Sequence, residues 1–179
     1  MPLTPFHYPV AYLVYRIDRR LNLPGLIVGS MFPDFEVPFM LLVFGTRTPH
    51  RLVLHSLLGA ATVGALLSVL LTVLVYPALI VKIFPLNKAK LKEKCRSSLS
   101  LWFSCFLGNI SHVLLDVVNH PYNPVFWPFL SIGETPSSVC SALGGMENAS
   151  LLIHTVLTVL FIALFVNKRD NFWEKLLVE

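Results

Sequence analysis

Long apolar runs separated by short polar segments dominate the pattern of hydrophobic positions in this chain. The runs that we expect to be helical are 8–20, 21–45, 52–85, 98–118 and 150–166. A helix needs about 20 residues to cross a bilayer, so 8–20 is expected to lie at the membrane interface or to enter the bundle partway, whereas the other four are expected to cross. The pattern therefore predicts an all-α integral membrane helical bundle of about four to five helices, with residues 1–179 forming a single domain.

Two of these runs have features that bear on their shape. A helix over 52–85 would be about 50 Å long at 1.5 Å per residue, so we expect it to tilt or to protrude from the bilayer. The run 21–45 is interrupted by F-P-D-F-E-V-P, in which Pro38 would leave the carbonyl of Asp34 without a helical donor. A break at this point would turn Asp34 and free backbone groups toward a cavity.

Composition strengthens the assignment to the membrane. Hydrophobic residues make up 55% of the chain and charged residues 13%, and the mean hydropathy is +0.68. The net charge of +4 is compatible with nucleic acid, but the basic residues are grouped beside apolar runs, which favours a role in membrane orientation. We therefore expect membrane lipids and no nucleic acid as partners. The three cysteines form no C-x-x-C pair, and the N-terminus lacks the pattern of a removable signal peptide.

The distribution of basic residues also predicts which way the bundle faces. Residues 87–96 form a basic loop that the positive-inside rule places in the cytoplasm. Alternation of the spans then leaves only Arg47 and Arg51, of 14 Lys and Arg, on the other side. We therefore expect a protein of the inner (cell) membrane, with a long outer loop at 119–147. A loop of that length in a small protein is more often a lid or a binding loop than idle chain.

The same topology brings the candidate chemistry to one level, near the outer face. His112 and Asp116 lie four residues apart, which on a helix is a separation of about 40° around the axis. Burying such groups is unfavourable unless they are paired, bound to metal or exposed to a water-filled cavity. The ionisable residues expected at this level are His7, Asp34, His50, His55, His112, Asp116, His120, Glu147 and His154. Imidazoles and carboxylates without thiolates suit zinc, manganese or iron.

Several of these residues also have simpler interpretations. A single histidine in an apolar helix is more often a hydrogen-bonded core residue than a ligand. The His112–Asp116 pair could be an intrahelical hydrogen bond, and Asp34 or Glu147 could cap a helix. In the outer loop, the aromatic group around Trp127 could be an interfacial anchor or a substrate contact. Asn119, at the start of that loop, is a further candidate for contacting substrate or supporting the ligands.

Four stretches of the chain resemble one known family. M-P-L-T-P-F-H at the N-terminus, L-I-V-G-S-M-F-P-D-F-E at 26–36, H-R-L-V-L-H-S-L-L-G at 50–59 and H-V-L-L-D at 112–116 resemble the YdjM-like family of membrane-bound proteins described as metal-dependent hydrolases. That family is distantly similar to the zinc-dependent phospholipases C and the zinc-dependent single-strand nucleases. The resemblance covers most of residues 1–120 and implies a metal-site end similar to the zinc-dependent phospholipase C bundle.

The resemblance also implies a set of ligands. By order in the chain, the family's ligand positions correspond to His7, Asp34, His55, His112 and Asp116. His120 matches the ligand after the His-x-x-x-Asp pair, with a shorter spacing. The later His-x-x-x-Glu is missing, because Glu147 precedes His154, and these two residues are assigned by position alone. The resemblance implies two or three zinc ions, with manganese as the alternative.

These observations favour a metal-dependent hydrolase that acts on a phosphoester, with a lipid as one candidate substrate. Asp34 is the candidate for orienting or deprotonating the attacking water, and Arg47 or Arg51 for contacting the phosphate. His50 is expected to support the ligands or to belong to the connecting loop. Two other functions stay open: a structural metal site in a partner-binding scaffold, and a site for translocating divalent ions or protons. Translocation ranks last because 63–83 and 157–166 offer few polar groups.

Overall fold

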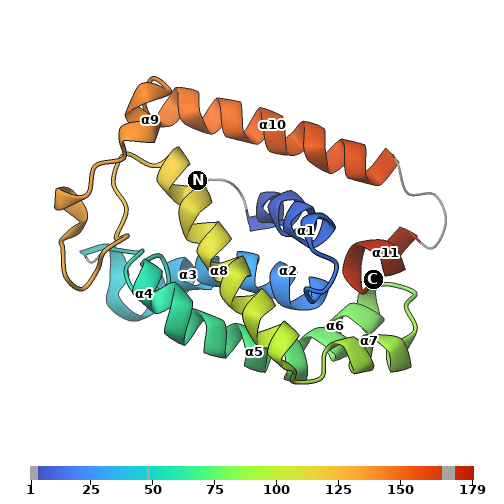
Figure 1. Cartoon of the computed structure of the whole chain (residues 1–179). Coiled ribbons are helices and arrows are strands. Elements are labelled where there is room, and N and C mark those ends of the chain that lie inside the picture. The colour runs from blue at the N-terminus through green and yellow to red at the C-terminus, as the bar shows by residue number, and fades with distance from the viewer. Residues whose placement is uncertain (1–3, 48, 167–171) are drawn as a thin grey trace.

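The structure is a computed structural model and describes residues 4–47, 49–166 and 172–179, without the side chains of Arg47 and Phe165. Within these ranges the regular structure is helical (Figure 1). The α-helices are α1 His7–Ile17, α2 Leu23–Met31, α3 Glu36–Phe44, α4 Leu57–Gly59, α5 Ala65–Leu74, α6 Tyr76–Ile83, α7 Lys88–Lys94, α8 Leu99–Asn119, α9 Ser138–Ala142, α10 Met146–Val166 and α11 Phe172–Leu177. Short 3-10 segments (η1 Thr4–Phe6, η2 Phe32–Phe35, η3 Gly45–Arg47, η5 Ile132–Glu134) and a π-helical segment (η4 Ala60–Gly64) connect or extend them.

Four helical segments of the described chain are long and apolar enough to cross a membrane. They are Leu23–Phe44, Leu57–Leu74, Leu99–Asn119 and Met146–Leu164. The prediction of an all-α membrane bundle is confirmed. Helix α1, which was too short to span, lies inside the bundle: Ala11, Tyr12 and Tyr15 are buried, and the Tyr8 hydroxyl donates to the carbonyl of Leu176 at 2.9 Å.

The closest helix pair at the centre of the bundle is α2 with α8, and glycine makes it possible. A Cβ atom on Gly29 would lie 2.5 Å from the carbonyl oxygen of Cys105, and one on Gly108 would lie 2.7 Å from the carbonyl oxygen of Leu26. Small residues let helix backbones approach in this way in membrane bundles. As a result, the segment that follows α2 meets the second half of α8.

The break in the first span is confirmed, but Pro38 does not cause it. The helix is interrupted at η2, Phe32–Phe35, with Pro33 in its first turn, and α3 then starts at Glu36. Pro38 is the third residue of α3, where its missing N–H has no helical acceptor to lose. Asp34 lies in this 3-10 segment and is buried.

The expectation of one long helix over 52–85 is wrong. Residues 50–56 form a loop, and the helix begins after Ser56, whose hydroxyl accepts from the N–H of Gly59 at 3.0 Å. At the other end, α5 stops at Leu74 and α6 begins at Tyr76, with Pro77 in its first turn. An apolar run hides this break because Pro77 changes the helix direction without changing its hydrophobicity.

The two predicted loops contain short helices. The basic segment 87–96 forms α7, and the outer loop 119–147 contains η5 and α9. The loop is fastened to the end of α8, because the Ser137 hydroxyl donates to the carbonyl of Val117 at 2.5 Å, and an isolated antiparallel bridge joins Tyr122 to Pro136.

Candidate metal centre

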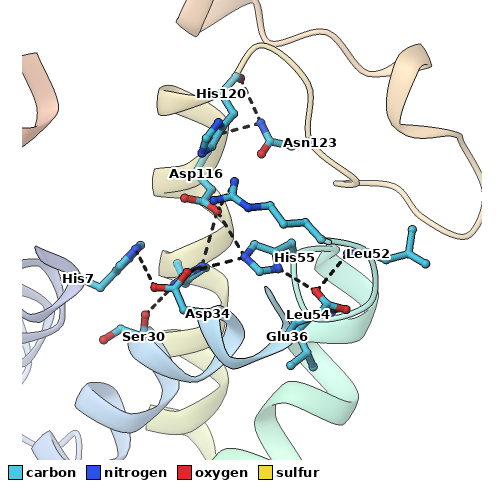
Figure 2. A network of polar contacts seen from close by, with 12 residues as sticks. His7, Ser30, Asp34, Glu36, Leu52, Leu54, His55, Asp116, His120 and Asn123 are labelled. Carbon is cyan, nitrogen blue, oxygen red and sulfur yellow. Dashed lines mark hydrogen bonds and ion pairs between the residues drawn. The ribbon is translucent and has the colours of Figure 1, made fainter. Parts of the chain in front are cut away.

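Five buried side chains from four segments meet beside the second half of α8. His7 opens α1, Asp34 lies in η2, His55 lies in the loop before α4, and His112 and Asp116 lie one turn apart on α8. Each is between 0 and 7% exposed. Figure 2 shows the His7, His55 and Asp34 side chains converging beneath Asp116. We call these five residues the metal centre.

The spacing of their nitrogen and oxygen atoms suits a shared cation better than hydrogen bonds. His112 Nε2 lies 3.6 Å from Asp34 Oδ1 and 3.6 Å from Asp116 Oδ2, and His55 Nε2 lies 3.6 Å from Asp116 Oδ2. These separations are too long for N–H···O hydrogen bonds. Two ligands about 2.1 Å from a tetrahedral zinc ion lie about 3.4 Å from each other, which is close to the separations observed.

Two overlapping groups in the described chain have ligand atoms that all lie within 4.8 Å of one another. One consists of His7, His112 and Asp116, and the other of Asp34, His55 and His112. Seven atoms of the five side chains are buried and lack a hydrogen-bond partner among the described residues: Nε2 of the three histidines and both carboxylate oxygens of the two aspartates. Buried polar groups are rarely left unpartnered, so this donor set fits a divalent metal ion.

The histidines of the second group are held in the tautomer that a metal requires. Nδ1 of His112 lies 2.8 Å from the carbonyl oxygen of Ser30, and Nδ1 of His55 lies 2.8 Å from Glu36 Oε2. Both oxygens can only accept, so each Nδ1 carries the proton and donates it. Each Nε2 therefore presents its lone pair to the centre, as in other metal sites in which a carbonyl or carboxylate orients the ligating imidazole.

Glu36 was not among the residues selected from the sequence. Its carboxylate is 6% exposed, and it accepts from the N–H groups of Leu52, Val53 and Leu54 at 2.7 to 3.2 Å as well as from His55. Glu36 therefore fixes both the His55 ring and the loop that carries it. The available signal was a second carboxylate two residues after Asp34 in an apolar run, because such a group must find donors when it is buried.

The two histidines at the edge of the membrane spans are neutral near pH 7. Burial, followed by the proximity of His112, lowers the pKa of His7 to about 3. The His7 and His112 rings stack with their centroids 4.0 Å apart. Burial, followed by the positive charge of Arg51, lowers the pKa of His120 to about 4. Neutral imidazole is the form that binds metal.

Arg51 reaches the metal centre from the loop, with Nη1 3.2 Å from Asp116 Oδ2 and a side chain 17% exposed. His120 caps the end of α8. Nε2 of His120 and the side-chain amide of Asn119 are buried with no partner in the described part of the chain, as is Nε2 of His50. None of these three residues belongs to either ligand group.

The remaining candidates from the sequence are Glu147, His154, Trp127 and Arg47. Glu147 is exposed, and Nδ1 of His154 donates to the carbonyl of Ser150 at 2.6 Å, while the His154 ring packs edge-on against Phe6. Neither residue belongs to either ligand group, and the same is true of Trp127, which is half-buried in the outer loop. The side chain of Arg47 lies outside the described part of the structure.

Comparison with known proteins gives one match. The family model described as YdjM inner membrane protein matches residues 8–178, which is nearly the whole chain. No curated protein and no solved structure matches the chain. The distant similarity to phospholipases C and nucleases is therefore still a prediction.

Proposed function

The chain belongs to the YdjM inner membrane protein family, and from this premise we propose that it is a membrane-bound, metal-dependent hydrolase of a phosphoester. The observation that carries the proposal is the set of seven buried atoms at the metal centre that have no hydrogen bond among the described residues; one of them, Asp116 Oδ2, is also ion-paired with Arg51. We expect zinc, two or three ions, with manganese as the alternative, and the ligands are His7, Asp34, His55, His112 and Asp116. His120 is the candidate for a further ligand.

Asp34 and Arg51 have distinct roles in this proposal. Divalent ions bound there would polarise the phosphoryl oxygens and bring the pKa of a bound water to near neutrality. Asp34, whose two oxygens face His112 on one side and His7 on the other, would orient that water and accept its proton. Arg51 points a partly exposed guanidinium at the centre, where its paired N–H groups match two phosphoryl oxygens.

An apolar pocket beside the centre supports a lipid substrate. The pocket measures about 550 Å³ and lies between α3 and the α4–α5 segment. Phe35, Phe39 and Val63 line it, and so do Glu36 and Leu54 of the network in Figure 2. Both walls belong to membrane-spanning segments, so an acyl chain could enter from the bilayer while its headgroup reaches the metal centre.

The proposed orientation places the metal centre toward the extracytoplasmic side. Basic residues from two distant segments gather at the other end of the bundle, where Arg19, Arg20, Lys90, Lys94 and Arg96 line one pocket. This basic end is the cytoplasmic one by the positive-inside rule. The outer loop 119–147, joined to the end of α8, would then cover the centre as a lid.

A translocation site receives less support. Ser68 and Thr72 continue the buried polar groups along α5, but they are already bonded: Asn109 donates to the Ser68 hydroxyl at 2.9 Å, and Thr72 donates to the carbonyl of Ser68 at 2.7 Å. Side chains satisfied in this way stabilise helix packing and leave few groups to carry an ion.

The experiment that tests the proposal is elemental analysis of the full chain purified in detergent. The variants are His112→Ala and Asp116→Ala, with His154→Ala as the control, since it removes a histidine outside the centre. We expect two or more equivalents of zinc or manganese in the wild type and in the control, and their loss in the two variants. The loaded protein should then hydrolyse a lipid phosphoester. Metal at background level in folded wild type would refute the proposal, and loss in all three variants would remove its assignment to these residues.

A further inference from the structure

A second, separate cavity lies at the basic end of the bundle. It measures about 850 Å³ and lies beside the segment that leads into α8, whereas the metal centre is near the other end of that helix. One wall is apolar and comes from α5 and α6, and the other is charged and comes from α6, α7 and the start of the α7–α8 connection. The charged residues are Lys82, Lys88, Lys92, Glu93 and Arg96.

The lysines of α7 are divided between two faces of the helix. Lys90 forms an ion pair with Glu174 at 2.6 Å, and Lys94 donates to the carbonyl of Glu179 at 2.6 Å, so this face fastens the C-terminal helix α11. Lys88 and Lys92, four residues apart, line the cavity. Neither of them, nor Lys82 or Arg96, forms an ion pair with any residue in the described ranges. The positive-inside rule accounts for the number of basic residues here, but not for the gathering around one cavity of four cations that form no ion pair within the described ranges.

The apolar wall is a product of the break between α5 and α6. Leu74 ends the membrane span and is 69% exposed, and Pro77 and Ala78 continue the wall in the first turn of α6. The wall therefore begins where the span leaves the membrane, and the cations lie just beyond it. This is the order in which a phospholipid presents its acyl chains and then its phosphate.

We propose that this cavity binds an anionic phospholipid, with its phosphate between Lys88, Lys92 and Arg96 and an acyl chain along the wall of α5 and α6. The volume falls within the range of roughly 300–1,000 Å³ that is usual for ligand pockets. Four cations against the single carboxylate of Glu93 favour a headgroup with net negative charge over a zwitterionic one. The site does not depend on the metal centre or on its chemistry.

The test uses the full-length protein in detergent and native mass spectrometry during titration with phosphatidylglycerol or with phosphatidylcholine of the same chain length. The double variant K88Q/K92Q removes two cations from the cavity, and K90Q/K94Q removes two from the opposite face of the same helix. We expect the wild type to retain one phosphatidylglycerol in preference to phosphatidylcholine. K88Q/K92Q should bind it about 25-fold more weakly, at roughly fivefold for each cation near a membrane surface, whereas K90Q/K94Q should retain the preference.

Two further measurements distinguish the alternatives. Ala78→Phe fills the apolar side of the cavity and leaves every cation in place, so it should also abolish phosphatidylglycerol binding. This variant tests the site even if K88Q/K92Q does not fold. Glycerol phosphate, which carries the anion without the chains, should not compete. Equal losses in both double variants would indicate a non-specific basic surface and overturn the proposal, as would equal binding of the two lipids or full competition by glycerol phosphate.

Discussion

Glu36→Gln is a sharp test of how the metal centre is held, because it changes one charge and almost no volume. The Glu36 carboxylate accepts from His55 Nδ1 at 2.8 Å and from the N–H groups of three residues in the preceding loop. A glutamine has one acceptor oxygen in place of two. Its NH₂ group is a donor and must therefore face other donors. These are either the N–H of Val53, or the N–H of Leu52 together with Nδ1–H of His55.

The size of the effect follows from these contacts. Each buried donor left unpaired destabilises the fold by about 1–3 kcal/mol, and the contacts that remain lose the strength of a charged acceptor. We expect a total of about 2–4 kcal/mol, or a fall in Tm of about 10 °C for a chain of this size. If the amide NH₂ donates to His55 Nδ1, the imidazole proton moves to Nε2 and the lone pair that faces the centre is lost. Metal affinity should then fall about 10- to 100-fold.

Two assays separate these effects: thermal melting in the presence of chelator, and metal affinity by competition with a chromogenic chelator. Glu147→Gln is the matched control, since Glu147 is exposed and lies outside both ligand groups. It should leave both readings unchanged. If Glu36→Gln keeps the wild-type Tm and metal affinity, Glu36 neither orients His55 nor holds the loop that carries it.

Three further predictions concern the helix contact, the pocket and the arginine. Gly108→Ala should lower both Tm and metal content, because its Cβ would lie 2.7 Å from a backbone oxygen of α2, whereas Gly133→Ala, with nothing within 4 Å, should change neither in melting and elemental assays. Val63→Phe narrows the apolar pocket and should raise KM for long-chain lipid phosphoesters while leaving short-chain ones unaffected in a steady-state assay. Arg51→Ala should retain the metal but lower kcat/KM about 100- to 1,000-fold, as expected for a lost donor to a developing negative charge; an unchanged kcat/KM would remove Arg51 from the mechanism.

The elements that local pattern determines were predictable. Helix α8 follows the predicted run to within one residue at each end, since its cap Ser98 and its apolar face are both local signals. The pairing of His112 with Asp116 needed only helical periodicity. The break at Pro77 was missed because apolar residues continue through it, and the start of the helix at Leu57 was missed because the loop before it is as apolar as a helix.

The partners of the centre were predictable only in part. Alternation of the spans predicts the depth of each residue in the membrane, but not its position around the axis of the bundle. Glu147 and His154 were expected at the level of the other ligands, yet α10 packs on the side of α1 away from α2 (Figure 1). The carbonyl of Ser30, which orients His112, has no signature in a side-chain pattern. Its role follows from the glycine contact between α2 and α8, which forms only in the folded bundle.

The charge balance of the centre bears on the choice between a structural and a catalytic metal. Asp34 and Asp116 contribute two negative charges and Arg51 one positive charge, while histidines that bind metal are neutral. The charge of Glu36 is already compensated by its four N–H donors. One divalent ion would therefore leave the centre with a net charge of about +1, and two ions with about +3. A buried structural site is stable when its charges cancel, whereas a site with excess positive charge needs a bound anion to balance it. The anionic phosphoester of the proposed function would supply that charge, and Arg51, partly exposed at the edge of the centre, is placed to contact it.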